Sequence, residues 1–378
     1  MRVPMLMSIA VACTGKEPAD SGGVPLEPLE LSGDPAASGV PVGVRTIERD
    51  GVTIELWYPA PDSVAAEAAS PVDFAGFIPA SVTETLGDLA LPVIGTTAVR
   101  DAPVRNAGEA FPAVVFSHGF GGTRLQSIDY AEHLASRGYI VAAADHPGRM
   151  LGDVLPCLFS PPLEGCDLTG FGADPALDDV AVVVDTLDVL AEDGFLSGFV
   201  DTERLGMSGH SAGGNTTGAM GDIEPRFAAL LSMAAPGAPD RSVPTLLMDG
   251  TCDGVIPTEG VDEAFEALPA GQRVRILGAG HLAFSDLCTL ELGRLADELL
   301  AGRDDVNEAL LPQLVALGTD GCPGVVPTVV REECVDAWLP LETSEPIIRH
   351  MSTVFFDAHL KGTGPGVQAG VFSGVEVE

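Results

Sequence analysis

The sequence predicts an α/β fold with a mostly parallel central sheet that is flanked by helices. Short apolar segments that suit buried strands alternate with segments of helical periodicity, for example residues 113–116 and then 125–135. This alternation is typical of parallel strands joined by right-handed crossovers. The 378 residues, 46% of them hydrophobic, suffice for one large core. No internal repeat is visible, so we expect one domain that carries insertions.

The charge of the chain is strongly acidic. Asp and Glu outnumber Lys and Arg by 55 to 19, which gives a formal net charge of −36. Such a surface repels phosphate backbones and anionic lipid headgroups, so we exclude nucleic acid as a partner. We interpret the acidic excess as a solvated surface that keeps the protein soluble.

The first 38 residues are expected to precede the folded domain. Residues 1–12 contain Arg2 and a short apolar stretch, which is typical of a signal peptide and too short to span a bilayer. Small residues directly before Cys13 resemble a bacterial lipoprotein signal, in which this cysteine is lipidated. Ordinary signal-peptidase cleavage after Ala12 is the alternative. Residues 13–38, rich in Gly, Pro, Ser and acids, should form a flexible tether.

We therefore expect an exported protein that is lipid-anchored to the bacterial envelope, or otherwise periplasmic or secreted, with membrane contact through the anchor only. The cysteines agree with export. Six follow Cys13, none in a CxxC pair, which disfavours a structural zinc site. An even number in an exported chain indicates disulfides. Six cysteines allow about 15 pairings, and we choose the nearest-neighbour set: Cys157–Cys166, Cys252–Cys288 and Cys322–Cys334.

The domain is expected to span residues 39–378. It starts with antiparallel edge strands, because residues 53–58 alternate in polarity, and it ends with a helix from about Ser344 to Gly362. Two segments exceed the regular pattern, an Ala-, Pro- and Ser-rich excursion at about 60–109 and a helical insertion at 287–343. Further strands are expected at residues 139–144, 204–207, 228–234, 243–248 and 274–277, and a further helix from 174.

The main chemical signal is Gly209–Gly213 (GHSAG), which fits the pattern G-x-S-x-G and lies between an expected strand and an expected helix. In this nucleophile elbow of the α/β-hydrolase fold, a sharp turn holds the serine in a strained conformation, and flanking glycines avoid collisions. The helix N-terminus favours developing negative charge. The motif predicts an α/β-hydrolase with Ser211 as its nucleophile.

A serine nucleophile needs a base and an acid that orients the base, and with this elbow the chain order is Ser, Asp or Glu, then His. His281 follows the last expected strand, as a loop-borne base would. His350 and His359 fall within the final helix and are interpreted as surface or core residues.

For the acid we choose Asp253, which lies just past the strand at 243–248. Asp249 is the alternative, although it is close to the strand end. Asp286, beyond His281, is expected to have a structural or capping role.

Acyl transfer also needs donors for the oxyanion, and residues 118–122 (HGFGG) directly follow a buried strand. We assign this role to the backbone N–H groups of Phe120 and Ala212, each of which would contribute about 3 kcal/mol to transition-state stabilisation. His118 is expected to brace this loop. His146 and His210 are interpreted as local structural residues. The mechanism requires no metal or organic cofactor.

With these motifs the chain resembles the platelet-activating-factor acetylhydrolase and dienelactone-hydrolase-related branch of the α/β hydrolases. The resemblance implies hydrolysis of carboxylic esters, often with short acyl chains, and Ser211, Asp253 and His281 fall on the triad positions of the group. Dienelactone hydrolases proper use a cysteine nucleophile, so Ser211 argues against that activity. The similar segments are residues 56–60, 111–119, 134–139, 209–213 and 280–286.

Bacterial polyester hydrolases are also similar around the elbow, and some carry a disulfide near their catalytic loops. A Cys252–Cys288 bond would join the Asp and His loops here. The expected substrate is a small-molecule or lipid ester. Cleavage of amides or peptides by the same triad is the nearest alternative, and a catalytically inactive surface binding protein is a remote one.

Overall fold

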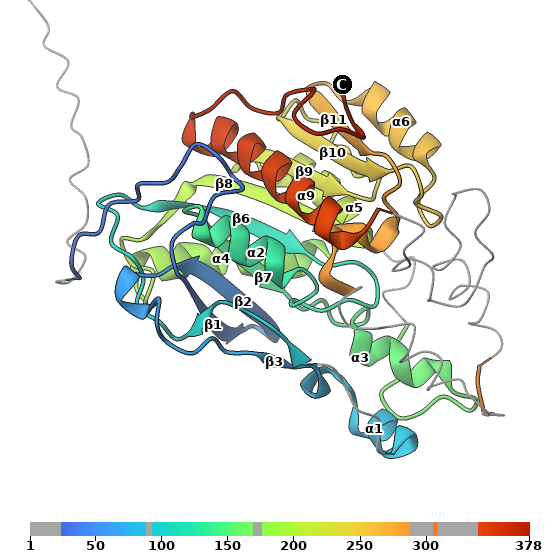
Figure 1. Ribbon diagram of the computed structural model, residues 1–378. Coiled ribbons are helices and arrows are strands. Elements are labelled where there is room, and N and C mark those ends of the chain that lie inside the picture. The colour runs from blue at the N-terminus through green and yellow to red at the C-terminus, as the bar shows by residue number, and fades with distance from the viewer. Residues whose placement is uncertain (1–23, 88–92, 169–175, 288–304, 308–338) are drawn as a thin grey trace, which may run out of the picture.

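The computed structural model describes residues 24–87, 93–168, 176–287, 305–307 and 339–378 (Figure 1). Its centre is a ten-stranded sheet with the order β12-β11-β10-β9-β8-β6-β7-β2-β1-β5. The six strands β11, β10, β9, β8, β6 and β7 are adjacent in this order, and each runs parallel to its neighbour, as predicted. The strands of this sheet are β1 Val42–Arg49, β2 Val52–Pro59, β5 Val99–Arg100, β6 Phe111–Ser117, β7 Ile140–Ala144, β8 Val200–His210, β9 Phe227–Met233, β10 Thr245–Gly250, β11 Gly271–Ile276 and β12 Val375–Val377.

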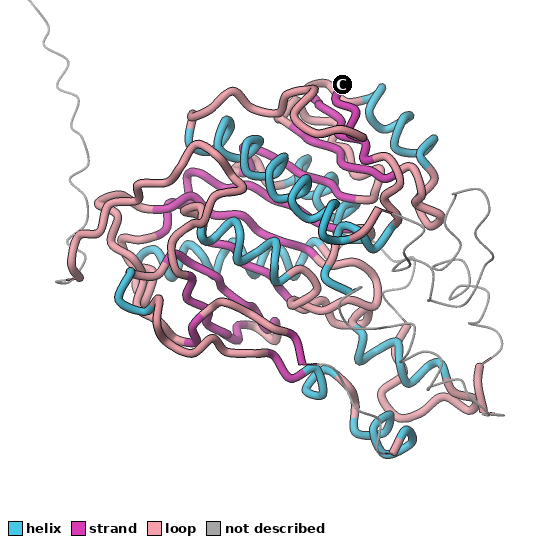
Figure 2. The backbone as a smooth tube through the Cα atoms, in the orientation of Figure 1, coloured by secondary structure: helices cyan, strands magenta, loops and turns pink. Residues whose placement is uncertain are grey.

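Helices cover both faces of this sheet (Figures 1 and 2). In β6, Val114 and Phe116 belong to the core beneath α2 and α9, whereas Ala113 and Val115 belong to the core beneath α4 and α5. A strand that is buried on both faces needs apolar residues at every position, which explains its continuous apolar run. The helices are α1 Ala80–Leu86, α2 Ile128–Ser136, α3 Leu151–Val154, α4 Leu177–Glu192, α5 Ala212–Ile223, α6 Thr258–Ala267 and α9 Leu341–Phe356.

The predicted antiparallel strands form the hairpin β1–β2. Its turn is Asp50-Gly51, with φ of 51° and 82°, and Asp-Gly is a favoured pair for a two-residue turn with positive φ at both positions. The hairpin is not at the edge of the sheet, contrary to our prediction. The short strand β5, from the excursion at 60–109, pairs with β1 and is the outermost strand.

The rest of the excursion packs over the domain. It contains a small separate sheet of β3 (Val72–Asp73) and β4 (Val93–Ile94), the helix α1, and two 3-10 turns, η1 (Asp62–Val64) and η2 (Phe74–Phe77). Glu132 of α2 is buried and accepts hydrogen bonds from the backbone N–H groups of Thr97 and Ala98. This carboxylate therefore fixes the end of the excursion to the core.

The N-terminal prediction is corrected in part. Residues 1–23, with the expected signal peptide and Cys13, lie outside the described residues. From residue 24 on, the expected tether packs against the domain: the N–H of Glu27 donates to Asn106 O at 2.7 Å, and the Arg105 Nε donates to Glu27 O at 3.0 Å. Arg137 is buried and donates to Ser32 O. These hydrogen bonds join buried arginines to carbonyl groups that are distant in the sequence. Local composition therefore does not reveal them.

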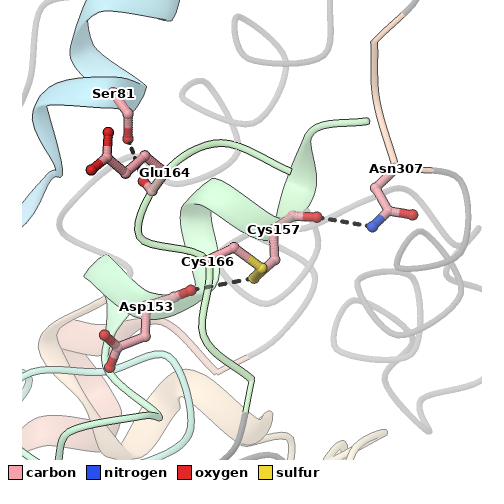
Figure 3. Close-up of a disulfide and its surroundings, with 6 residues drawn as sticks. All are labelled: Ser81, Asp153, Cys157, Glu164, Cys166 and Asn307. Carbon is pink, nitrogen blue, oxygen red and sulfur yellow. Dashed lines mark hydrogen bonds between the residues drawn. A yellow bond between two sulfur atoms is a disulfide. The ribbon is translucent and has the colours of Figure 1, made fainter. Parts of the chain in front are cut away.

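The structure contains the predicted disulfide Cys157–Cys166, in a loop that also holds α3 and the turn η3 (Leu155–Leu158). The Ser81 Oγ of α1 donates to Glu164 O at 2.7 Å, and the Asn307 Nδ2 donates to Cys157 O at 3.0 Å (Figure 3). The loop therefore joins the excursion to residues 305–307. Cys252 is also disulfide-bonded. Its predicted partner Cys288, the predicted pair Cys322–Cys334 and most of the insertion at 287–343 lie outside the described residues.

The final helix α9 starts at Leu341, three residues before the predicted start, and Pro346 lies inside it. It continues as a π-helical turn, η7 (Asp357–Lys361), and ends at Gly362 in the left-handed conformation, as predicted. His350 and His359 lie on these two elements. Among the described residues, no helix has both the length and the apolar character that a membrane span needs.

Candidate active site

The strained turn of the predicted elbow is present between β8 and α5. Ser211 has φ of 55° and ψ of −118°, a conformation that non-glycine residues rarely adopt. A Cβ at Gly209 would lie 2.2 Å from Gly213 O, and a Cβ at Gly213 would lie 1.9 Å from Ser117 O. Both flanking positions therefore require glycine. The Ser211 hydroxyl stands at the N-terminus of α5 and is partly exposed.

The structure brings the three predicted triad residues into one hydrogen-bonded line. His281 Nε2 lies 2.9 Å from Ser211 Oγ, and His281 Nδ1 lies 2.8 Å from Asp253 Oδ2. His281 starts the 3-10 turn η4 (His281–Phe284) and, like Asp253, is buried. The other oxygen, Asp253 Oδ1, accepts the backbone N–H groups of Val255 at 2.9 Å and Ile256 at 2.7 Å. These two donors fix the carboxylate, so Oδ2 faces the imidazole.

The two other acids near these loops have different partners. Asp249 is buried and pairs with Arg275 at 2.5 Å, and burial raises the pKa of its carboxyl group. Asp286 accepts the N–H of Asp129 at 2.8 Å at the start of α2, so the capping role expected for it is confirmed. Burial raises the pKa of Asp286 to about 8.

The loop at residues 118–122, which we expect to bind the oxyanion and call the oxyanion loop, passes directly beside Ser211. A Cβ at Gly119 would lie only 3.2 Å from Ser211 Cβ. The following turn is held by the Gly121 N–H, which donates to Arg149 O at 2.8 Å. The second expected donor, the N–H of Ala212, belongs to the first residue of α5, and the first N–H groups of a helix have no carbonyl partner within it. Both assigned donors, Phe120 and Ala212, thus belong to segments at the serine.

Three further histidines lie beneath this site, all of them buried: His118, His146 and His210. Burial lowers the pKa of His118 and His146 well below the usual 6.5, and it lowers that of His210 to about 3. His118 Nδ1 donates to Gly119 O at 2.7 Å and its Nε2 accepts the His146 N–H at 3.2 Å. His118 therefore braces the oxyanion loop as a neutral ring, as predicted.

One residue of this site, Gln126, was not predicted from the sequence. Gln126, just before α2, is buried and accepts the Gly119 N–H at 2.8 Å through its Oε1. Its Nε2 lies 2.7 Å from His210 Nδ1. The only signal in the sequence was a polar residue at the start of an apolar helical pattern, which surface positions share.

A cavity of about 490 Å³ lies beside the oxyanion loop and is lined by Thr123 and Met150, among others, but not by Ser211. Charged groups on its wall pair with each other: Glu55 with Arg100 at 2.6 Å and with Arg124 at 3.2 Å. Because these bonds join β5, β2 and the loop after the oxyanion turn, we assign the cavity wall a structural role.

Within the described residues, one group of carboxylates approaches the geometry of a metal site: Asp129, Asp286 and Glu345. Arg349 forms ion pairs with Asp129 and, at 3.3 Å, with Glu345. The guanidinium group supplies the positive charge that a metal ion would bring, so we do not assign a metal to this group.

Comparison with known proteins supports the architecture. Residues 48–150 match the family model "Platelet-activating factor acetylhydrolase, isoform II", a range that includes the oxyanion loop and ends before Ser211. A ferulic acid esterase from Streptomyces cinnamoneus superposes with a TM-score of 0.57 at 22% identity, over 90% of this chain and 98% of that chain. The chain has the α/β-hydrolase fold. The resemblance to the platelet-activating-factor acetylhydrolase group is confirmed for residues 48–150. No curated protein sequence matches the chain.

Proposed function

We propose that this α/β-hydrolase is a serine carboxylic-ester hydrolase that acts through an acyl-enzyme on Ser211. The observation that carries the proposal is the hydrogen-bonded line from Ser211 through His281 to Asp253, with the serine on a strained elbow. The names of the matching family and of the solved neighbour both describe ester hydrolysis, which supports this reaction class.

The reaction has two steps. His281 Nε2 takes the hydroxyl proton as Ser211 Oγ attacks the ester carbonyl, and the resulting imidazolium is stabilised by Asp253. The tetrahedral intermediate collapses, the alcohol leaves with the proton from His281, and the acyl group stays on Ser211. His281 then takes a proton from water, the hydroxide attacks the acyl-enzyme, and the proton returns to Ser211 Oγ as the acid leaves.

The oxyanion of each intermediate is bound by the backbone N–H groups of Phe120 and Ala212 in this proposal. Two features support the assignment: Gly119 lies against Ser211 Cβ, and Ala212 begins α5, whose dipole favours negative charge at this end. Loss of one such donor typically lowers kcat by about 100- to 1000-fold.

We propose short-chain or lipid-derived esters as substrates. The decisive assay uses purified protein with p-nitrophenyl esters from acetate to palmitate, beside Ser211→Ala. Triad members act as a unit, so the variant should lose at least about a thousandfold in kcat. Folded wild-type protein that is no faster than Ser211→Ala on every ester would contradict the proposal. The chain-length profile distinguishes a short-chain esterase from a lipase.

Matched amide and polyester substrates test the alternatives with the same triad, an amidase or peptidase and a polyester hydrolase. A fluorophosphonate probe tests the remote alternative of a binding protein, because only an activated serine reacts with it. Labelling of wild-type protein and not of Ser211→Ala supports an active serine hydrolase of any kind.

We also propose that the protein is exported and anchored by a lipid on Cys13. The disulfide Cys157–Cys166 agrees with an oxidising compartment. Mass spectrometry of the mature protein tests this: a diacylated N-terminal Cys13 supports the anchor, whereas an unmodified N-terminus after Ala12 supports secretion without it.

A further inference from the structure

Gln126 lies at the centre of a line of hydrogen bonds that joins the three loops of the candidate site. The Gly119 N–H donates to Gln126 Oε1 at 2.8 Å, Gln126 Nε2 lies 2.7 Å from His210 Nδ1, and His210 Nε2 lies 2.9 Å from His281 O. Gly119 belongs to the oxyanion loop, His210 precedes the nucleophile, and His281 is the base.

The donors and acceptors along this line are fixed by chemistry. A backbone N–H can only donate, so the oxygen of the Gln126 amide faces Gly119 and its NH2 group faces His210. An amide NH2 can only donate, so His210 Nδ1 accepts and the ring proton is on Nε2. That proton then donates to His281 O. A neutral His210 is required throughout, which agrees with the burial that lowers its pKa to about 3.

We propose that Gln126 is a positioning residue that holds the oxyanion loop, the nucleophile and the base at their working distances; this rests on the proposed ester hydrolysis. On this line, the Gln126 side chain joins Gly119 of the oxyanion loop to the ring of His210. Gln126 is also held at its backbone, where its carbonyl accepts the Asp286 N–H at 3.0 Å, just beyond the base loop. Aligned hydrogen bonds in a buried site strengthen one another.

The line acts on geometry and not on proton transfer. The ring centroids of His210 and His281 lie 4.8 Å apart, and the hydrogen bond from His210 goes to the backbone carbonyl of His281 and not to its imidazole nitrogens. Loss of the bridge should therefore lower kcat and leave KM nearly unchanged. A displacement of about 1 Å between reacting groups costs up to about 100-fold in rate.

The test compares Gln126→Met, which keeps the volume and removes both bonds, with Gln126→Glu and with a control, Gln272→Met on β11. We expect kcat on p-nitrophenyl acetate to fall 10- to 100-fold in Gln126→Met, roughly the range expected for lost positioning, with KM within about threefold of wild type and no change in the control. A kcat within threefold of wild type in folded Gln126→Met overturns the proposal.

Gln126→Glu provides a readout that does not depend on activity. A carboxylate cannot donate to His210 Nδ1, so one further proton must lie between the two groups, either on the new carboxyl group or on His210, and the 15N resonance of His210 Nδ1 should differ from that of wild type. Wild-type protein should show the neutral ring with its proton on Nε2. An unchanged Nδ1 resonance in Gln126→Glu, or the other tautomer in wild type, overturns the proposal. If ester hydrolysis itself is absent in wild type, the proposed function fails while these NMR results still test the line.

Discussion

Replacement of Asp253 by Asn should abolish most of the proposed ester hydrolysis, because the hydrogen bonds of Asp253 determine how the new amide group is oriented. Asp253 Oδ1 accepts two backbone N–H groups, those of Val255 and Ile256. In Asp253→Asn the carbonyl oxygen must stay with these two donors, because an NH2 group there would face N–H groups. The NH2 group therefore occupies the Oδ2 position and donates to His281 Nδ1.

This donation forces the wrong tautomer on the base. His281 Nδ1 then has to accept, its proton moves to Nε2, and Nε2 can no longer take the proton of Ser211. In a serine protease triad the equivalent change lowers kcat about 10⁴-fold. We expect a similar loss here, equivalent to about 5 kcal/mol of transition-state stabilisation.

The assay is kcat on p-nitrophenyl acetate at neutral pH, with Asp249→Asn as the control. Asp249 is the other candidate acid, and it contacts Arg275 instead of the imidazole. Its variant should lose stability and keep kcat within about threefold, the level expected when no transition-state contact is lost. A loss below about 30-fold in folded Asp253→Asn, or an equal loss in Asp249→Asn, would refute the reasoning.

Three further predictions concern the surroundings of the site. Gly119→Ala should lower kcat about three- to tenfold, because its Cβ would lie 3.2 Å from Ser211 Cβ and displace the oxyanion loop; unchanged steady-state kinetics would contradict this. Because burial raises the pKa of Asp286 to about 8, the folded state binds more protons than the unfolded state above about pH 4, and stability should fall as the pH rises to about 8. Urea unfolding at several pH values should show that the free energy of unfolding decreases less with rising pH in Asp286→Asn than in wild type. An equal decrease in both proteins would argue against this role of Asp286. Replacing both Cys157 and Cys166 by Ser should lower the free energy of unfolding by roughly 2–3 kcal/mol, and an unchanged urea midpoint would be the contrary result.

The sequence predicted the parts of the fold that are governed by local rules. A buried parallel strand needs a continuous apolar run, and an elbow needs glycines at Gly209 and Gly213, so both can be read from short segments. The order of Ser, Asp and His along the chain then points to Ser211, Asp253 and His281. The structure joins these three residues, which come from different strand ends.

Other features depend on contacts between distant segments. The short strand β5 exists because β1 offers it a partner, and Val99–Arg100 alone has no strand pattern. Residues 24–38 look like a free tether by composition, yet Arg105 and Arg137 bind their carbonyl groups. The role of Gln126 depends on Gly119 and His210, which no periodicity connects.

The positions of the candidate residues along the sheet have a consequence for how this protein can change. Ser211, Asp253 and His281 follow β8, β10 and β11, all parallel strands whose carboxyl ends share one edge. The excursion between β2 and β6 leaves this sheet at another point of the chain. The residues of the proposed triad and the excursion thus come from separate stretches of sequence. Substitutions in the excursion therefore replace no residue of the proposed triad.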